Sequence, residues 1–231
     1  MKLKDKPILL FIILFLGMEF FSYLCFSLLH IDYNTKNEFI RIIFDVLFML
    51  IIIFLIYRND LKEEGIRYIK NFKSNFFKVI LIYMLGLLIM YVSNNLIAYF
   101  FTEANPGNEE GVRKLINNYP IYMCFSTIIY APFVEEITFR KSIFNIFKKI
   151  GNERIKKWLS IIVSGLIFGL LHVVGTANGI YDYLYIIPYA SLGIALALMY
   201  YKTNSIFVPI TIHAIHNLVA MILYFGVSSI L

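Results

Sequence analysis

Long apolar runs separated by short polar segments dominate the chain. The hydrocarbon core of a bilayer is about 30 Å thick, so a helix needs roughly 20 mostly apolar residues to cross it. Stretches that meet or approach this length lie at 7–29, 39–57, 76–101, 120 through 140, 158–174, 183–201 and 206–227. The pattern therefore predicts an all-α fold, a polytopic transmembrane helical bundle of about seven spans.

The amino-acid composition supports this fold class. Of the 231 residues, 60% are hydrophobic and 16% are charged, whereas soluble domains have about 45–50% and about 25%. The two cysteines, Cys25 and Cys124, lie inside apolar runs, which excludes a disulfide scaffold. The net charge of +6 does not indicate a nucleic-acid partner, because the basic residues flank the apolar runs. The partner that the composition implies is the lipid bilayer.

The positions of Lys and Arg predict how the chain lies in the cell membrane. Six of them fall within 58–78 and five within 148–157. The alternate connections are poorer, since 31–38 has one and 175–182 has none. Short basic connections favour the cytoplasm, so we expect a multi-pass protein with a cytoplasmic N-terminus and an extracytoplasmic C-terminus. The segment 58–78 could also bind anionic lipid or a regulator, but a topology signal explains it more simply.

Several ionisable side chains fall inside the predicted spans, where each costs at least about 2.5–3.5 kcal/mol to insert and is a functional candidate by default. They are Glu19, Asp45, Glu135, Glu136, Arg140, His172, His213 and His216. Three amides, Asn94, Asn95 and Asn217, accompany them. We expect Asn94 and Asn95 to form hydrogen bonds between helices.

Two adjacent carboxylates, Glu135 and Glu136, lie on the fourth predicted span. Adjacent helical positions are about 100° apart, so the two side chains cannot point the same way. Glu136 and Arg140 are four residues apart and can form an ion pair. Glu135 is then turned toward another surface, where it can act as a general acid or base.

The remaining polar side chains lie on two further spans. His172 follows Gly169, a residue that lets another helix approach closely. His213, His216 and Asn217 share one arc of the last span, because they are three and four residues apart. A carboxylate, three histidines and an amide on three helices supply acid, base and hydrogen-bond donor groups that can converge in one polar cavity.

The chemistry that this set allows is hydrolysis. The sequence contains no Gly-x-Ser-x-Gly elbow, no His-Glu-x-x-His zinc motif and no phosphate loop. A carboxylate and a histidine can activate a water, while a second histidine and an asparagine donate hydrogen bonds to an oxyanion. The same side chains can instead bind a divalent metal such as Zn²⁺. The residues alone leave both alternatives open.

Three motifs occur in order on separate predicted spans: Glu135-Glu136…Arg140, Phe168…His172 and His213…Asn217. They resemble the Glu-Glu-x-x-x-Arg, Phe-x-x-x-His and His-x-x-x-Asn/Asp signatures of the CAAX protease and bacteriocin-processing family, also called the Abi family. The resemblance covers roughly 120–227. It divides the chain into N-terminal membrane spans over 1–119 and a catalytic helical core over 120–231.

The resemblance implies an intramembrane endopeptidase whose bundle encloses a cavity open to lipid and solvent. In the glutamate-type mechanism proposed for the family, Glu135 and His172 position and deprotonate the water. His213 and Asn217 form the oxyanion hole. Glu136 and Arg140 then have a structural role, and we expect the same of His216, which occupies a variable position of its motif.

Cofactor and substrate follow from the same resemblance. We expect no cofactor, because an asparagine suits an oxyanion hole better than a Zn²⁺ site. If a metal is bound, its ligands are Glu135, His172, His213 and His216. The expected substrate is a hydrophobic or membrane-tethered peptide or protein. The bias toward Lys, Asn, Ile, Phe and Tyr indicates an AT-rich genome, which favours a short hydrophobic or secreted peptide over a prenylated protein.

Two other functions fit the same residues. Some members of the family lose the motifs and act by binding, so a non-catalytic membrane scaffold or bacteriocin-immunity protein is one alternative. The retention of every motif residue favours an enzyme, since unused polar groups are costly in lipid. Glu/His relays also serve transporters, but transporters often contain inverted repeats and the sequence shows none.

The depth of the motifs differs between spans. At 1.5 Å per residue, His172 lies roughly 21 Å from Trp158, whereas His213 lies only about 10 Å from Ile206. A tilt, a helix that begins outside the membrane or a broken helix would each bring the two histidines to one level.

Overall fold

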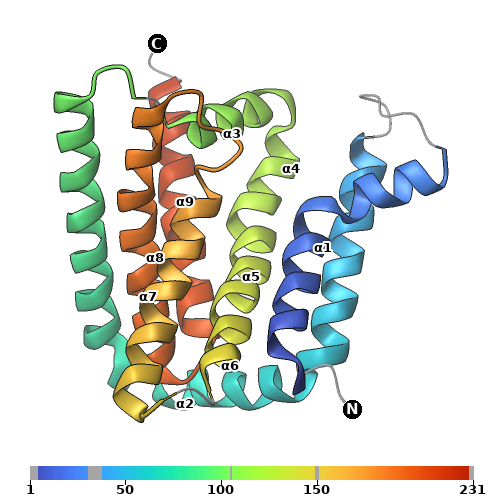
Figure 1. Ribbon diagram of the computed structural model, residues 1–231, viewed down its shortest axis with the longest axis vertical. Helices are drawn as coiled ribbons and strands as arrows, with labels where there is room; N and C mark the ends of the chain where they lie inside the picture. Colours follow the sequence, from blue (N-terminus) through green and yellow to red (C-terminus); the bar gives the residue numbers. More distant parts are fainter. Residues whose placement is uncertain (1–4, 31–37, 105, 149–150, 229–231) are drawn as a thin grey trace.

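The computed structural model describes residues 5–30, 38–104, 106–148 and 151–228. Within these ranges the chain is helical and contains no strand. Most of the helices stand side by side along the long axis of the molecule (Figure 1). The predicted fold class, a helical membrane protein, is confirmed.

The first hundred residues form two helices. α1 (Pro7–Leu28) bends by 69° between residues 7–18 and 20–28. α2 (Glu38–Phe100) is 63 residues long; it descends beside α1, crosses beneath the other helices and rises on their far side (Figure 1). The predicted spans 39–57 and 76–101 are its two upright arms. The basic stretch between them, which the residue pattern predicts to be a connection, is helical, and we call residues 58–75 the elbow.

The segment with the two adjacent carboxylates is one long helical run. It begins after α3 (Gly107–Asn118), which lies across the end of the molecule opposite the elbow (Figure 1). Two turns of the run, η2 and η3, are π-helical and flank the short α-helix that carries Glu135 and Glu136. Its parts are α4 (Pro120–Phe125), η2 (Ser126–Tyr130), α5 (Ala131–Glu136), η3 (Ile137–Ser142) and α6 (Ile143–Phe147).

The last part of the chain adds three upright helices, α7 (Glu153–Leu171), α8 (Ile186–Thr203) and α9 (Phe207–Ser228), with a 3₁₀ turn, η4 (Ile180–Tyr185), before α8. α7 and α8 pack closely because glycines line their contact. A Cβ atom on Gly169 would lie 2.6 Å from the backbone nitrogen of Ala190, and one on Gly165 would lie 2.6 Å from that of Ile194. The close approach predicted at Gly169 is therefore confirmed.

The link between α8 and α9 lies inside the molecule. Ser205 and Ile206 are buried, and the carboxylate of Glu64 in the elbow accepts a hydrogen bond from the Ile206 backbone N–H at 2.7 Å. α9 therefore begins against the inner side of the elbow, whereas α7 begins with an exposed turn at Glu153. This difference explains why His213 follows so soon after the start of its helix.

The predicted count of seven spans is not confirmed. Among the described residues, three helical stretches are long and apolar enough to cross a membrane: Ile43–Phe100, Ile180–Thr203 and Phe207–Gly226. The bent α1 is a fourth if its two halves form one span. α2 counts once although it has two arms. The run from α4 to α6 carries the charged motif, and the first turn of α7 is rich in charge, so neither has a long uninterrupted apolar stretch.

Candidate active site

A fully buried ion pair joins Glu136 of α5 to Arg140 of η3. Arg140 Nε lies 2.9 Å from Glu136 Oε2, and neither side chain is exposed. The pair predicted from their spacing is thus present. Arg140 also donates to the Gly193 carbonyl of α8 at 3.3 Å, and its guanidinium carbon lies 4.7 Å from the centre of the Phe168 ring. These contacts compensate a charge that would otherwise be costly inside the molecule.

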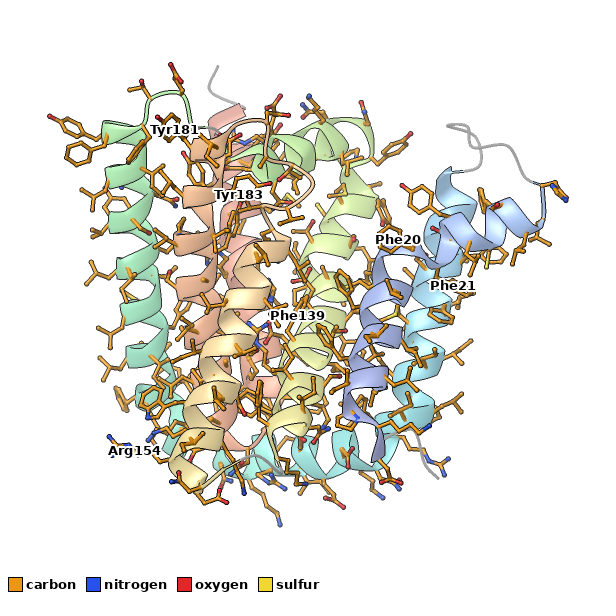
Figure 2. The ribbon with its side chains drawn as sticks, in the orientation of Figure 1. Phe20, Phe21, Phe139, Arg154, Tyr181 and Tyr183 are labelled. Carbon is orange, nitrogen blue, oxygen red and sulfur yellow. The ribbon has the colours of Figure 1, made fainter. Side chains whose placement is uncertain are left out.

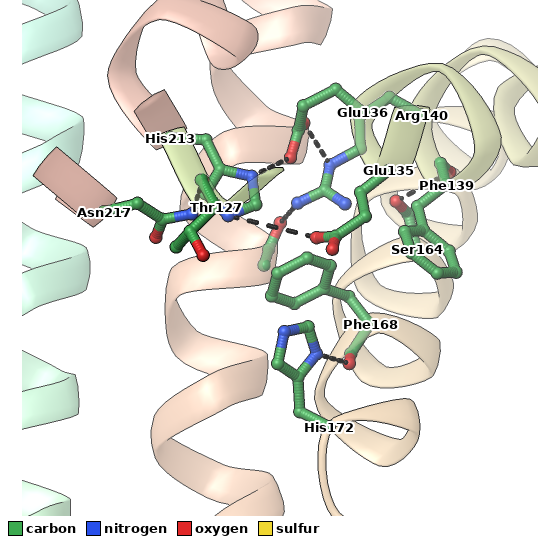
Figure 3. Close-up of polar contacts among 11 residues, drawn as sticks. Thr127, Glu135, Glu136, Phe139, Arg140, Ser164, Phe168, His172, His213 and Asn217 are labelled. Atoms are coloured by element: carbon green, nitrogen blue, oxygen red, sulfur yellow. Dashed lines mark hydrogen bonds and ion pairs between the residues drawn. The ribbon is translucent and has the colours of Figure 1, made fainter. Parts of the chain in front are cut away.

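His213 of α9 is bound to the same carboxylate. Its Nδ1 lies 2.9 Å from Glu136 Oε1, so Glu136 binds Arg140 through one oxygen and His213 through the other (Figure 3). An Nδ1–H that donates to a carboxylate fixes the orientation of the ring and leaves Nε2 for other partners. Here Nε2 lies 3.9 Å from Glu135 Oε2.

Glu135 has different surroundings from its neighbour. Its side chain is 18% exposed, whereas that of Glu136 is completely buried. Because the two residues are about 100° apart on the helix, Glu136 faces Arg140 and the carboxylate of Glu135 points to the side of the imidazole that Glu136 does not contact (Figure 3). The structure therefore places a carboxylate on each side of His213.

The ring of Phe168 links the two histidines of the site. Its centroid lies 5.7 Å from that of His213 and 4.3 Å from that of His172. His172 Nδ1 lies 2.8 Å from the Phe168 carbonyl oxygen, which again leaves Nε2 for other partners. On its other side His172 stacks on Tyr189 of α8, with 4.9 Å between the ring centroids. His172 therefore lies one helical turn after Phe168 on α7, and the Phe168 ring lies between the two histidines.

The last two predicted residues of α9 have separate partners. Asn217 Nδ2 donates to the backbone carbonyl of Thr127 in η2 at 2.8 Å, which places it beside the carboxylate helix (Figure 3). His216 Nδ1 lies 3.2 Å from the Tyr83 hydroxyl of α2. The structure thus brings Asn217 to the site and directs His216 toward α2.

The prediction for Asn94 and Asn95 is wrong. Asn95 Nδ2 donates to the Tyr91 carbonyl of its own helix at 2.8 Å. The structure shows no hydrogen-bond partner for Asn94 among the described residues. Within the described ranges, neither amide therefore joins two helices.

The four side chains expected to hold a metal, if one is bound, do not form such a site. Within the described ranges no three His, Cys, Asp or Glu side chains are grouped so that they could hold an ion. In particular, His216 contacts α2, and the Phe168 ring lies between His172 and His213.

Sequence reasoning missed several contacts of the site. Tyr189 stacks on His172, and the carbonyls of Gly193 and Thr127 accept from Arg140 and Asn217. None of these three belongs to a motif. Backbone carbonyls have no residue-specific signal, and tyrosines are common near the ends of membrane helices whatever their role. The sequence therefore held no signal that could have found these contacts.

Comparison with known proteins supports the motifs. Residues 117–219 match the family model described as type II CAAX prenyl endopeptidase Rce1-like. The membrane-embedded CAAX protease MroQ of Staphylococcus aureus is 30% identical over 141 residues, which are 58% of this chain and 53% of that protein. YdiL of Bacillus subtilis, provisionally named a membrane peptidase, is 28% identical over 116 residues, 50% of this chain and 42% of that protein.

A third relative extends further along the chain. An uncharacterized protein of Mycoplasma capricolum is 28% identical over 192 residues, 76% of this chain and 52% of that protein. The chain spans about half the length of the curated relatives it matches, and no solved structure matches it. The family match covers all three motifs, and the resemblance that they indicate is confirmed: residues 117–219 of this chain are similar to the Rce1-like CAAX protease family of membrane proteins.

Proposed function

We propose that this chain is an intramembrane endopeptidase that hydrolyses a peptide bond in a hydrophobic or membrane-tethered peptide. The observation that carries the proposal is the buried network of Glu136, Arg140 and His213 with Glu135 beside it. Four ionisable groups in one site of a membrane bundle are expensive unless they serve a function. The family match and the name of MroQ, a CAAX protease, support the same activity.

In this proposal Glu135 is the general base. Its carboxylate takes a proton from a water that His172 helps to position through Nε2, and the resulting hydroxide adds to the carbonyl carbon of the scissile bond. The C–N bond then breaks, and Glu135 returns the proton to the leaving amine. His172 can accept a hydrogen bond at Nε2 because its Nδ1 is bound to the Phe168 carbonyl.

His213 and Asn217 stabilise the oxyanion in the same proposal. A donor aimed at the developing charge is worth about 10²–10³-fold in rate. To donate from Nε2, His213 carries protons on both ring nitrogens, and Glu136 accepts the one on Nδ1. Asn217 has two amide hydrogens, of which the Thr127 carbonyl accepts one. The reaction uses protein side chains and water, without a metal.

The basic end of the molecule faces the cytoplasm in this proposal. The elbow of α2, the start of α7 and the end of α8 all lie at that end (Figure 1). They carry most of the Lys and Arg residues in the connections, and such residues favour the cytoplasmic side. The short α3 and the η4 turn then face the extracytoplasmic side.

A cleavage assay tests the activity. The purified chain, Glu135→Gln and His216→Ala are each incubated in detergent with a library of membrane-tethered and short hydrophobic peptides, with and without a chelator, and products are read by mass spectrometry. We expect Glu135→Gln to lose about 10²–10⁴-fold in rate, while His216→Ala, which contacts Tyr83 and not the network, retains cleavage. Loss of cleavage on chelation, restored by Zn²⁺, would contradict the metal-independent mechanism.

A chain that cleaves nothing requires a second test. Cells that lack the protein receive either the wild-type chain or Glu135→Gln, and the phenotype of the deletion is compared. Full rescue by Glu135→Gln would overturn the enzyme and leave a membrane scaffold as the function.

A further inference from the structure

A cleft of about 330 Å³ opens near the end of the molecule that carries α3, between the second arm of α2, the start of α3 and the start of α8. Its volume is within the range of roughly 300–1,000 Å³ found for ligand pockets. Apolar and polar side chains share its walls. The lining residues used below are Asn94, Asn95, Pro106, Glu109, Tyr185 and Tyr189.

α2 and α8 are in close contact below the cleft, and further along α2 Ile97 packs with Tyr185 at the start of α8. At Gly86 a Cβ atom would lie 2.7 Å from Ala195 Cβ, and Ser191 Oγ donates to the Gly86 carbonyl at 3.3 Å. About two helical turns further along α2, Asn94 and Asn95 face the cleft in place of a neighbouring helix. The glycine contact thus holds the two helices together below an opening between them.

The cleft leads to His172. Tyr189 lines it and stacks on His172 at 4.9 Å between ring centroids. A smaller cavity next to it is lined by His172 and shares Pro106, Tyr185 and Tyr189 with the cleft. A molecule bound in the cleft is therefore separated from His172 by a single aromatic ring.

The polar groups of the cleft suit a peptide main chain. The Asn94 amide has no hydrogen-bond partner among the described residues, although it belongs to a membrane span where an unsatisfied amide is costly. An asparagine amide both donates and accepts, and an extended peptide offers an N–H and a C=O in each residue. Together Asn94 and Asn95 can hydrogen-bond such a segment.

The charge of the cleft discriminates between side chains. Of the described residues that line it, Glu109 is the one that carries a formal charge at neutral pH. Its carboxylate pairs with Arg113 at 2.6 Å, and Arg113 does not line the cleft. An acidic side chain placed there meets a like charge, which costs affinity, whereas a neutral or basic one does not.

We propose that the cleft formed by Asn94 and Asn95 of α2, Glu109 of α3 and Tyr189 of α8 is a substrate subsite, which binds an extended peptide segment next to His172 and rejects acidic side chains. The inference rests on the proposed peptidase function, because the peptide is taken to be the substrate. It adds where the substrate lies and which residues it disfavours.

Binding is tested separately from cleavage. Glu135→Gln protein is mixed with short leucine- and alanine-rich peptides that carry one benzoylphenylalanine, irradiated and mapped by mass spectrometry. We expect cross-links to α2 around Asn94 and to the first turn of α3, and we expect Asn94→Leu to reduce them. Cross-links confined to α1 and the first arm of α2 would overturn the subsite whether or not the wild-type chain is a peptidase.

Specificity is tested with matched variants. Peptides that the wild-type chain cleaves are made with Gln, Lys or Glu at each position flanking the cleaved bond, and kcat/KM is compared. At one position we expect Glu to be at least about tenfold poorer than Gln. Glu109→Gln should remove most of that penalty, whereas Glu110→Gln, which loses an equivalent exposed pair with Lys114, should keep it.

The outcomes separate the two proposals. Cleavage with a penalty that Glu109→Gln does not change overturns the subsite and leaves the peptidase intact. Cross-links at Asn94, together with full rescue of the deletion phenotype by Glu135→Gln, retain a peptide-binding cleft and overturn the proposed function.

Discussion

Glu136 holds two partners at once, and this makes it a positioning residue. One oxygen pairs with Arg140 and the other accepts from His213 Nδ1. The first contact compensates a buried cation, and the second decides which nitrogen of His213 is directed toward Glu135. Glu135 makes neither of these two contacts. The loss of Glu136 should therefore change both stability and cleavage, whereas the loss of Glu135 should change cleavage alone.

Glu136→Gln is expected to reduce both stability and activity. The substitution leaves Arg140 fully buried without a carboxylate, a loss of about 3–5 kcal/mol in the free energy of unfolding. Glu135→Gln removes a partly exposed carboxylate and should unfold near the wild-type temperature while it loses cleavage. Thermal unfolding in detergent, measured on both variants, checks the difference.

The double variant Glu136→Leu with Arg140→Met provides the control. Replacing both partners by apolar side chains leaves no uncompensated charge, so most of the stability should return. Cleavage should not, because His213 has lost the carboxylate that orients it. Equal unfolding temperatures for Glu136→Gln and the wild type would contradict the structural importance of the pair.

At the scale of single residues, helical spacing predicts local pairs and not distant ones. The pair of Glu136 and Arg140 follows from their separation of four residues. The contact between Glu136 and His213 joins residues 77 positions apart, and the relative height of α5 and α9 decides it. That height depends on the buried α8–α9 link, which no residue pattern indicates.

Two π-helical turns set the geometry of the carboxylate helix. η2 and η3 flank α5, and such turns are frequent at functional sites. Pro132 is in the first turn of α5, directly after η2, so the helical run continues through a proline that could have broken it. The Thr127 carbonyl of η2 accepts from Asn217, which ties this irregular turn to α9.

The contact between α7 and α8 should be sensitive to a single methyl group. In Gly169→Ala the added Cβ would lie 2.6 Å from the Ala190 nitrogen and 2.8 Å from the Ile186 carbonyl oxygen. Both are backbone atoms, so the helices must separate, and His172 moves with α7. We expect about 1–3 kcal/mol lower stability and, since a 1 Å displacement can cost about 10²-fold, a large loss of cleavage.

Gly111→Ala is the matched control for this change. A Cβ on Gly111 meets no atom within 4 Å, so the variant should cleave and unfold like the wild type. Unfolding temperature and kcat/KM of the two variants are measured together. A fully active Gly169→Ala protein would show that the spacing of α7 and α8 does not position His172.

The elbow shows where the prediction of elements failed. Its charges and the low hydrophobicity between two apolar runs indicated a connection, yet α2 continues through it as helix. Tertiary contacts stabilise it there: Glu64 pairs with the buried Lys141 of η3, and Arg67 donates to the Asn204 carbonyl at 2.6 Å. Partners more than seventy residues away along the sequence are invisible to a local pattern.

At the scale of the whole molecule, the charge pattern predicts more than the count of apolar runs does. The connections rich in Lys and Arg lie at one end of the bundle (Figure 1), as their alternation along the sequence indicates. Side chains at the lipid-facing surface are apolar over most of its height (Figure 2). The number of crossings cannot be read in the same way, because the helical run with the charged motif and the bent α1 both depart from a simple apolar run. The division at residue 120 also stays a prediction.

The orientation of the bundle can be tested by cysteine labelling. Cys25 and Cys124 are first replaced by alanine, and single cysteines are introduced at exposed positions of the two ends, Lys62 and Lys202 at the basic end, Glu110 and Asn178 at the other. Because basic connections are retained in the cytoplasm, a membrane-impermeant maleimide applied to intact cells should label positions 110 and 178. Positions 62 and 202 should react only after permeabilisation. The reverse pattern would contradict the proposed orientation and would place the cleft of Asn94 and Glu109 on the cytoplasmic side, where it would bind cytoplasmic segments of a substrate.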